Sequence, residues 1–398
     1  MPDRESQIEH RKSRVVIAGA GPAGSSLAIR LAKAGFEVVL IEREKFPRHK
    51  LCGEFVSPEC IRHFNDLGVG GQMLDAAGDR IVATNFYSQS GRSVSVPSEW
   101  LGGDSALGIS RDVMDATLIE EARRAGAEVF EETSLVEVER DGDRVGQLSV
   151  RTADGSRRTI GGDLFVDATG RSCVLANLVR RKISGRSGTV HPERRYIGFK
   201  AHLENVDLEP GVCEIYLFDG GYGGLNFVGN GVANHCFLVT SETFKAAGSV
   251  SCLLDEVVYR NPRARKAMEN SRPLFDWLAV SVGRFGRKEL TPTANLFTVG
   301  DSAAFIDPFT GSGMLLALES AELLADAIVG GHDIGAVYTR TYEARFAGRL
   351  RVSGLLRGAA SWPRAASGLI ASLSASRSIL RRIARATRGE RRRTSRTT

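Results

Sequence analysis

The segment from residue 14 to residue 42 constrains the fold more strongly than any other part of the chain. An apolar run at 15–17 leads into the glycine-rich sequence GAGPAG at 19–24, and a second apolar run at 37–41 follows a stretch of small and apolar residues. This order predicts a strand, a tight turn, a helix and a second strand, which together form one βαβ unit. Such a unit predicts an α/β fold with a doubly wound parallel sheet.

The glycine spacing in this turn matches the needs of a dinucleotide site. Gly19 permits the tight turn, Gly21 lets the backbone approach a pyrophosphate, and Gly24 allows the helix to pack closely on the sheet. The N-terminus of the helix supplies unpaired N–H groups and the positive end of a dipole. Glu42 ends the second strand at about the spacing expected for a carboxylate that binds ribose hydroxyls. We therefore predict cofactor contacts from Gly19, Gly21, Pro22, Ala23, Gly24, Glu42 and Arg43.

Residue spacing excludes several other classes of protein. The six cysteines and seven histidines show no CxxC, HExxH or HxxxH pattern, so we expect no structural disulfide and no metal site. Residues 1–14 are charged and lack an apolar segment, and no apolar run is long enough to span a membrane. These features predict a soluble, cytoplasmic globular protein with a large core.

The positive charge of the chain is concentrated at its C-terminal end. From residue 345 onward there are 14 arginines, no lysine and one acid, Glu390, so this tail carries +13 and the remaining residues carry −7. Residues 369–388 have the pattern of an amphipathic helix. Its apolar face comprises Leu369, Ile370, Leu373, Leu380, Ile383 and Ala384, and its basic face comprises Arg381, Arg382, Arg385 and Arg388.

Two interpretations of this basic helix remain open. In the first, the helix lies on an anionic membrane surface at the inner face of the membrane and brings the protein to a lipid-soluble ligand. In the second, its apolar face docks on the acidic body of the same chain. Nucleic-acid binding is not expected, because the tail lacks interleaved aromatic residues and a recognised nucleic-acid-binding domain.

Segments far along the chain extend the dinucleotide pattern into a flavin site. They are the sequence DATG at 167–170, the sequence FTVGDSAA at 297–304 and the sequence DPFTGSGM at 307–314. Together with residues 15–42 and Arg111, they resemble the signature segments of the flavoprotein superfamily that contains aromatic hydroxylases, flavin halogenases and geranylgeranyl reductases. The resemblance covers most of residues 14–330. It implies that the dinucleotide is FAD.

The resemblance also implies a role for individual residues around FAD. Asp301 would bind ribityl or pyrophosphate oxygens, and Arg111 would approach the nucleotide from the side. The backbone amide of Leu135 would meet the adenine. A helix N-terminus near residue 313 would face the N1–C2=O edge of the flavin, where its dipole stabilises the reduced anion. The implied FAD contacts are Arg111, Leu135, Gly170, Asp301, Pro308, Gly311, Gly313 and Met314.

Strand and helix patterns, with this resemblance, predict interleaved domains. A discontinuous Rossmann-like FAD-binding domain is expected from residues 1–70, 105–183 and 291–330. Short alternating runs separated by glycine turns predict an antiparallel sheet, so residues 71–104 and 184–290 are expected to form a substrate domain. Residues 331–398 are expected to form the helical basic tail. The overall class is therefore α/β, or α+β when the antiparallel domain is included.

The loop at 45–58, KFPRHKLCGEFVSP, is the first candidate reaction site. It resembles the segment FPRxKxCGGGLSP of geranylgeranyl reductases, which covers one face of the isoalloxazine. Cys52 and Gly53 match, whereas Glu54 and Phe55 stand where two glycines are usual. Glu54 is a candidate proton donor or base if burial raises its pKa. The alternative is that Glu54 points to solvent and Cys52 is a small packing residue.

The segment GYGGLNF at 221–227 is the second candidate reaction site. It resembles the GYxWxFP segment of the reductases, in which Tyr222 is retained, but Gly224 and Phe227 replace the tryptophan and the proline. The substrate clamp has therefore been rebuilt. The GWxWxIP-like segment of halogenases is absent, so halogenation is not expected. The candidate catalytic residues are Cys52, Glu54 and Tyr222.

Three function classes follow from the resemblance, all of them with FAD. The favoured class is a flavin monooxygenase that hydroxylates a large hydrophobic substrate of phenolic or polyketide, quinone or prenyl type. The first alternative is a geranylgeranyl-reductase-like enzyme that reduces unsaturated prenyl chains, and the second is a flavin-binding protein without turnover. No second dinucleotide fold is visible in the sequence. We therefore expect electrons from transiently bound NAD(P)H or from a partner reductase.

Overall fold

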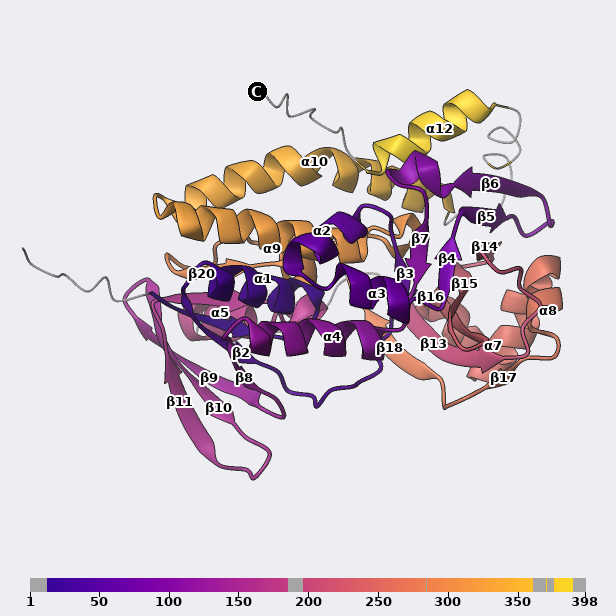
Figure 1. The fold of residues 1–398 in the computed structure, drawn as a ribbon. Helices are drawn as coiled ribbons and strands as arrows, with labels where there is room; N and C mark the ends of the chain where they lie inside the picture. Colours follow the sequence, from indigo (N-terminus) through magenta and orange to yellow (C-terminus); the bar gives the residue numbers. More distant parts are fainter. Residues whose placement is uncertain (1–12, 185–195, 284, 361–369, 371–375, 389–398) are drawn as a thin grey trace, which may run out of the picture.

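The computed structural model describes residues 13–184, 196–283, 285–360, 370 and 376–388. Two apolar residues of the predicted tail helix, Leu369 and Leu373, lie outside this part of the chain. Figure 1 shows a smaller set of strands at one side of the molecule and a large sheet at the other. The long helices α9 (Gly313–Gly330) and α10 (Ile334–Ala360) run along the top of the first of these regions.

A five-stranded parallel sheet forms the core of the first region. Its strand order is β20-β12-β1-β2-β8. The strands are β1 (Arg14–Ala18), β2 (Glu37–Ile41), β8 (Glu128–Phe130), β12 (Leu164–Asp167) and β20 (Leu296–Thr298). The register places Val15 between Val38 and Leu164, so β1 is central and buried on both faces. This arrangement confirms the α/β class predicted from the glycine turn.

Both faces of the parallel sheet are covered. On one face lie α9 and two further helices, α1 (Pro22–Lys33) and α4 (Arg111–Arg124). α1 begins at Pro22, where a proline loses no helical hydrogen bond and its fixed φ suits the first turn. The other face is covered by a three-stranded meander and a helix. These elements are β9 (Ser134–Asp141), β10 (Arg144–Arg151), β11 (Arg157–Gly161) and α5 (Val174–Ser184).

The second region is a large sheet with the strand order β17-β13-β16-β15-β14-β5-β6, in which β18 also pairs with β13. Its pairs are antiparallel, as the alternating runs predict, except that β14 runs parallel to β5. The strands are β5 (Ala83–Tyr87), β6 (Ser93–Pro97), β13 (Tyr196–Glu204), β14 (Val212–Phe218), β15 (Gly221–Gly229), β16 (Val232–Thr240), β17 (Arg272–Pro273) and β18 (Leu278–Val282).

Short helices and a small sheet complete the two regions. One face of the large sheet packs against α6 (Ser241–Ala247), α7 (Val250–Glu256) and α8 (Pro262–Met268). A three-stranded sheet combines β3 (Phe55–Val56), β4 (Asp79–Ile81) and β7 (Ala106–Gly108). Its strands come from three different predicted domain segments, so it joins the two regions. The remaining elements are α2 (Cys60–Leu67), α3 (Gly70–Ala76), β19 (Gly286–Arg287) and β21 (Ala304–Phe305).

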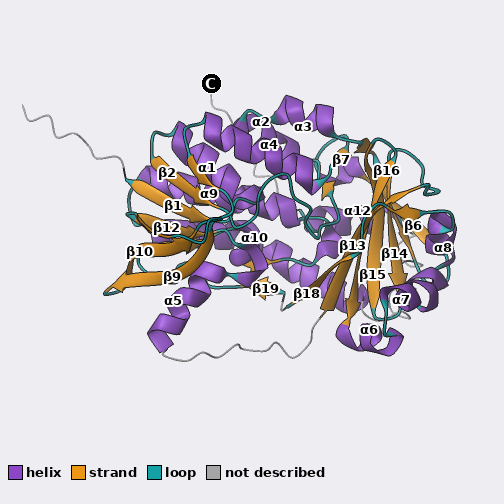
Figure 2. Ribbon diagram, turned by 90° about the horizontal axis from the view of Figure 1, so that it is seen from below, coloured by secondary structure: helices purple, strands orange, loops and turns teal. Residues whose placement is uncertain are grey.

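The two sheets lie at opposite ends of the molecule when it is viewed from below, with helical segments and loops between them (Figure 2). The C-terminal helix α12 (Arg377–Ala386) packs over the large-sheet region. No helix in the described part of the chain is both long and apolar enough to cross a membrane.

Candidate functional site

A cavity of about 1110 Å³ lies between the parallel sheet and the large sheet. On the parallel-sheet side its wall begins at the carboxyl ends of three strands, where Ala18, Ile41 and Ala168 line it. Ligands of open α/β sheets bind at this edge, because loops and helix N-termini converge there. On the opposite side the wall is formed by strands of the large sheet and by α12.

Almost every residue that the sequence predicts to contact the cofactor lines this one cavity. The lining residues of this set are Gly19, Gly21, Pro22, Ala23, Glu42, Arg43, Arg111, Leu135, Gly170, Asp301, Pro308, Gly311, Gly313 and Met314. Gly24 is the exception, because it faces the turn itself. A Cβ atom at this position would lie 1.8 Å from the carbonyl oxygen of Gly19, so Gly24 serves helix–sheet packing.

Two helices direct open N-termini toward the cavity. Gly21 caps α1 without a side-chain hydrogen bond, and the first turn of α1 contains no acid. Ser312 caps α9 in the same way, again without a side-chain bond or an acid in the first turn. The terminal N–H groups and the positive dipole ends are therefore available to an anionic or electron-rich ligand. This pair of sites fits the pyrophosphate and the flavin ring of FAD, respectively.

Glu42 and Arg111 are both held in fixed positions on the cavity wall. Oε2 of Glu42 accepts a hydrogen bond from the backbone N–H of Ala20 at 2.9 Å, and Oε1 accepts one from Glu44 at 3.2 Å. Arg111 donates two hydrogen bonds to Asp115, one helical turn later, at 2.8 and 2.7 Å. A Cβ atom at Gly21 would lie 3.9 Å from Nη2 of Arg111. The guanidinium therefore lies beside the glycine turn, as expected for a side contact to the nucleotide.

Asp301 presents a carboxylate to the cavity from the turn after β20. Burial raises the pKa of this carboxyl above its ordinary value, although the nearby Arg171 and Lys288 oppose the shift. Lys288 donates a hydrogen bond to the backbone carbonyl of Asp301 at 2.8 Å and so fixes the turn. An acceptor group placed in this way suits the hydroxyl groups of a ribityl chain.

Cys52 lines the cavity from the loop between β2 and β3. Its Sγ accepts a weak hydrogen bond from the backbone N–H of Glu54 at 3.4 Å, and its carbonyl accepts one from Asn234 Nδ2 at 3.1 Å. The loop is therefore attached to the large sheet. Cys52 and the neighbouring Gly53 both line the cavity.

Glu54 occupies neither of the two positions that the sequence left open. Its side chain is fully buried and does not line the cavity. Oε1 accepts a hydrogen bond from the backbone N–H of Arg111 at 2.7 Å and pairs with Lys200, while Oε2 lies 2.7 Å from Nε2 of His202. Burial would raise the pKa of Glu54, but the His202 hydrogen bond and the Lys200 charge lower it below its ordinary value.

The hydrogen bonds of Glu54 are therefore made within the protein, and its side chain does not line the cavity. Its acceptor atoms are used by the first turn of α4 and by β13, so its physical role is to tie these elements to the loop at 45–58. Lys200 adds a hydrogen bond to the carbonyl of Lys50 at 3.2 Å. Glu54 also has φ +53°, the left-handed conformation that glycine adopts easily. This explains how a carboxylate occupies a position where the related segment has a glycine.

Tyr222 lines the cavity from β15, but its hydroxyl group is engaged. It donates a hydrogen bond to Oδ1 of Asp307 at 2.5 Å, and its ring contacts Phe309 edge-on at 5.2 Å. Burial and the Asp307 charge raise the pKa of Tyr222 well above its ordinary value. Tyr222 therefore holds the turn before α9 against the large sheet and is a poor proton donor.

Sequence analysis missed the partners of Glu54. Lys200 and His202 lie two residues apart on β13, so they point to the same side of the strand, and both are buried. A lysine and a histidine at alternate positions of an otherwise apolar strand were the available signal, because buried charges need a partner. The sequence gives no indication that this partner comes from the loop at 45–58.

α12 forms part of the cavity wall. The residues that line the cavity from this end of the chain are Ile370, Leu380, Ile383, Ala384, Thr387 and Arg388. Leu380 and Ala384 are buried against Val94, Val96 and Leu101 of the large-sheet region. The described part of the apolar face is thus docked on the protein itself, the second of the two interpretations. Membrane contact would have to use the outer face of the helix.

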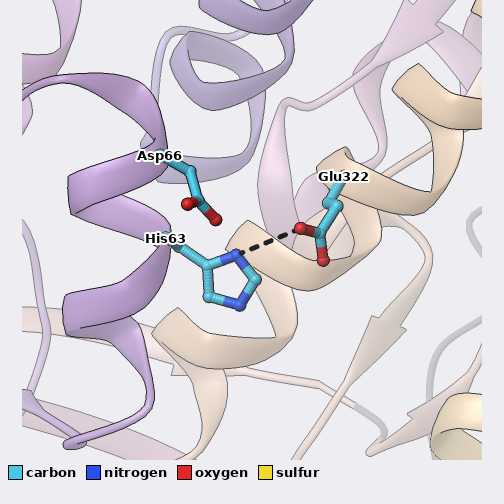
Figure 3. Close-up of side chains that lie close together, drawn as sticks. All are labelled: His63, Asp66 and Glu322. Carbon is cyan, nitrogen blue, oxygen red and sulfur yellow. Dashed lines mark ion pairs between the residues drawn. The ribbon is translucent and has the colours of Figure 1, made fainter. Parts of the chain in front are cut away.

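A second group of polar side chains lies away from the cavity. His63, Asp66 and Glu322 place their potential ligand atoms within 4.8 Å of one another (Figure 3). Nε2 of His63 lies 3.2 Å from the guanidinium of Arg62, and both Arg62 and Arg30 pair with Glu322. Burial and these arginines lower the pKa of His63 to about 3. A metal ion would compete with two guanidinium groups for the same carboxylate, so we assign no metal to this group.

Comparisons with known proteins agree with the geometry of the cavity. Residues 12–330 match the protein family described as FAD binding domain. A digeranylgeranylglycerophospholipid reductase of Methanosarcina acetivorans is 26% identical over 343 residues, which cover 85% of this chain and 80% of the relative. A menaquinone reductase of Mycolicibacterium smegmatis is 26% identical over 344 residues, which cover 80% and 77%.

Solved structures show the same fold. The structure of the flavin-dependent brominase Bmp2 has a TM-score of 0.77 with this chain at 20% sequence identity, and the match covers 94% of each chain. The family match spans most of the chain, and the cavity is lined by two open helix N-termini and by Glu42. The chain therefore belongs to the FAD-binding domain family and is an FAD-dependent oxidoreductase.

Proposed function

We propose that this enzyme reduces a carbon–carbon double bond in a large, mostly apolar, unsaturated substrate of prenyl or quinone type. The observation that carries the proposal is the position of Cys52, which lines the cavity, whereas Glu54 does not line it and the hydroxyl group of Tyr222 is bonded to Asp307. Relatives named digeranylgeranylglycerophospholipid reductase and menaquinone reductase support the choice of reaction and substrate class. On the sequence alone, hydroxylation is the favoured class and reduction is the first alternative.

The wall of the cavity at the large sheet suits an apolar substrate. Phe86, Val94, Val96, Leu101 and Leu217 line it, and none of these side chains is polar. Apolar area excluded from water contributes about 25 cal/mol per Å² to binding, before the cost of ordering the ligand. A long hydrocarbon, or a quinone with a prenyl chain, would pack against these apolar side chains.

The reaction divides between the cofactor and the chain. FAD, when bound and reduced, supplies a hydride to one carbon of the double bond. The other carbon needs a proton, and the thiol of Cys52, which lines the cavity in the loop at 45–58, would supply it. The guanidinium of Arg111 lies near Cys52. Solvent then returns a proton to the sulfur, which completes the reduction.

The test measures the anaerobic oxidation of the reduced flavin by a geranylgeranyl lipid, in which carbon–carbon double bonds are the electron acceptors. Cys52→Ala should slow this oxidation about a hundredfold, the usual contribution of a positioned acid. Flavin content, read from its visible absorbance, should be unchanged. Cys252→Ala, at an exposed cysteine of α7, is the matched control and should behave as the wild type. Equal rates for Cys52→Ala and the control would contradict the assignment of the proton donor.

Hydroxylation is the second candidate function, and the apolar wall that α12 adds to the cavity favours it. A reaction with oxygen on the reduced flavin needs a site shielded from water, and the apolar face of α12 shields the large-sheet end. If no unsaturated compound oxidises the reduced flavin without oxygen, and a phenolic substrate consumes oxygen with formation of a hydroxylated product, hydroxylation replaces reduction as the proposed function.

The electron source is proposed to be NAD(P)H that binds transiently, or a partner reductase. Stopped-flow reduction with NADH and NADPH separates the two sources. Rapid bleaching of the flavin by either nucleotide at micromolar concentration supports direct reduction. Bleaching that requires an added flavin reductase supports the partner.

We also propose that the outer face of α12 contacts anionic membrane surfaces. Its exposed residues include Arg377, Arg381, Arg382 and Arg385, together with Ile379, which is 52% exposed. Arginines near an anionic surface contribute about 1 kcal/mol each. Replacement of Arg381, Arg382 and Arg385 by alanine should abolish co-sedimentation with phosphatidylglycerol vesicles and leave α12 docked. Unchanged sedimentation of the triple variant would remove this proposal.

A further inference from the structure

The apolar half of the cavity contains one buried cation. Among the described residues that line the cavity from the large sheet and the C-terminal segment, Arg388 alone carries a formal charge. The other charged lining residues belong to the nucleotide half and its loops, for example Glu42, Arg111 and Asp301. A guanidinium placed at the end of a hydrocarbon-lined wall is costly to bury, so its presence requires an explanation.

The contacts of Arg388 satisfy only part of its hydrogen-bonding capacity. Nη2 donates a hydrogen bond to the carbonyl of Thr310 at 2.9 Å, in the turn before α9. Nε and Nη1 donate no hydrogen bond to the described residues. The side chain of Arg388 is 8% exposed. The carboxylate of Glu59 lies 3.8 Å from Nη1, beyond hydrogen-bonding distance, and Glu59 does not line the cavity. Within the described residues, the ion pair of Arg388 with Glu59 is long, and the Nε and Nη1 donors are enclosed by the protein without a hydrogen-bond acceptor.

The structure positions Arg388 next to the predicted flavin-facing turn. Its Nη2 lies 3.9 Å from the point where a Cβ atom of Gly311 would be, and Thr310 and Gly311 both line the cavity. Thr387 and Arg388 follow the last turn of α12, whose apolar face forms the adjacent wall. An elongated ligand that lies along this wall would bring one of its ends to the guanidinium.

We propose that Arg388 binds an anionic group, such as a carboxylate or a phenolate, of an otherwise apolar organic substrate. The proposal rests on the proposed function, because it assumes that the apolar wall holds the substrate. It adds that the substrate is an organic anion, oriented with its charged group at α12. An anionic group of the substrate would offset the buried positive charge of Arg388, and an interaction between charges in an apolar site is stronger than one in water.

The test compares two probes that share an aromatic framework and differ in one charged group. Anilinonaphthalene sulfonate carries a sulfonate, and phenylnaphthylamine is its neutral counterpart. Equilibrium dialysis against the full-length, FAD-loaded protein gives the affinity of each. The wild type should bind the sulfonate more tightly than the neutral probe. Arg388→Met should weaken binding of the sulfonate about tenfold or more, the usual result of removing one member of a buried charge pair, and change the neutral probe less than about twofold.

Two further variants control for structure and for surface charge. Arg388→Lys keeps the charge and should retain part of the preference for the sulfonate. Arg385→Met removes an exposed arginine of the same helix and should bind both probes as the wild type does. Equal losses of sulfonate affinity in Arg388→Met and Arg385→Met would overturn the proposal. So would an equal loss of both probes in Arg388→Met, because that result means only that α12 has left the wall.

Measurements on the wild type keep the proposal testable if Arg388→Met does not fold. A wild type without preference for the sulfonate overturns it. A preference that millimolar bromide abolishes also overturns it, because the site then binds a free inorganic anion and not an organic one. Failure of the proposed function has a different signature: the neutral probe does not bind, or no unsaturated compound oxidises the flavin, whatever the outcome of the charge comparison.

Discussion

Two carboxylates near the cavity, the buried Glu54 and the partly buried Asp301, have opposite electrostatic environments. Glu54 is surrounded by the N–H group of Arg111, by Lys200 and by His202, and these partners lower its pKa below the ordinary value. Asp301 faces the cavity, and burial raises its pKa. The first carboxylate is satisfied by the protein itself, whereas the second is left for a ligand.

The contrast separates groups that stabilise the structure of the site from groups that interact with a ligand. A buried charge with complete partners contributes to stability and to the position of the elements that it joins. A charge that costs energy in the empty protein is retained for an interaction with the ligand. By this criterion the loop at 45–58 contains one residue of each kind, because Glu54 joins α4 to β13 and Cys52 faces the cavity.

The largest expected effects come from the glycine turn, where the same contrast exists between two glycines. In Gly24→Ala the new Cβ atom would lie 1.8 Å from the carbonyl of Gly19, so we expect the parallel-sheet region not to fold. In Gly21→Ala the nearest atom is Nη2 of Arg111 at 3.9 Å, so the fold should survive while FAD affinity falls about tenfold or more. Circular dichroism and flavin release measure the two effects.

If both glycine variants lose structure to the same extent, Gly21 is required for folding as Gly24 is, and the two glycines do not have separate roles. Retained FAD in Gly21→Ala, at wild-type affinity, would show that the backbone at this residue does not approach the cofactor. Gly71→Ala, at an exposed position of α3 without a positive φ and with no atom within 4 Å of the new Cβ, controls for the general effect of replacing a glycine.

Replacement of Glu54 by glutamine should destabilise the protein by about 3 kcal/mol, because it leaves Lys200 buried without a counter-charge. The folded-state pKa of Glu54 lies below its ordinary value of 4.5. Its contribution is therefore complete above that pH and is lost as the pH falls through the folded-state pKa. Urea unfolding should show a constant difference between wild type and Glu54→Gln near neutral pH, and a smaller difference in stronger acid.

The control for this variant is Glu37→Gln, which removes an exposed carboxylate that pairs with Arg14. It should cost less than about 1 kcal/mol, as exposed ion pairs do. If Glu54→Gln is as stable as this control and slows flavin oxidation by substrate, Glu54 acts in the reaction, and the contrast with Asp301 is lost.

The nucleotide half could be predicted from the sequence because its signals are local. The turn at 19–24, Glu42 and the segment at 307–314 each specify a backbone geometry within a few residues, and the parallel sheet then brings them to one edge. The partners of Glu54 could not be predicted, because Lys200 and His202 lie about 150 positions away and meet it only through the packing of β13. The cavity-facing side of α12 was equally hidden, since amphipathicity does not identify the surface that a helix covers.

Tyr222→Phe tests a smaller interaction that also joins the two regions. It removes the hydrogen bond from the hydroxyl group to Asp307, and we expect a loss of about 1–2 kcal/mol in the free energy of unfolding. Substrate-driven flavin oxidation should change less than in Cys52→Ala, since the raised pKa of Tyr222 disfavours proton donation. If Tyr222→Phe abolishes the reaction and Cys52→Ala does not, the proton comes from Tyr222, and the assignment of the two residues must be exchanged.

Asp301→Asn should produce the smallest change in the free energy of unfolding. The sign of this change is what tests the contrast between the two carboxylates. Because burial raises the pKa of this carboxyl, its ionised form opposes folding at neutral pH, and the neutral amide should stabilise the apoprotein by about 1 kcal/mol or less. The same substitution should weaken FAD binding, since an amide offers fewer acceptor sites to ribityl hydroxyls. Thermal unfolding of the apoprotein and titration with FAD measure the two effects separately. If Asp301→Asn loses as much stability as Glu54→Gln, Asp301 also holds the structure of the site together. The difference between the two carboxylates would then reflect their location and not their function.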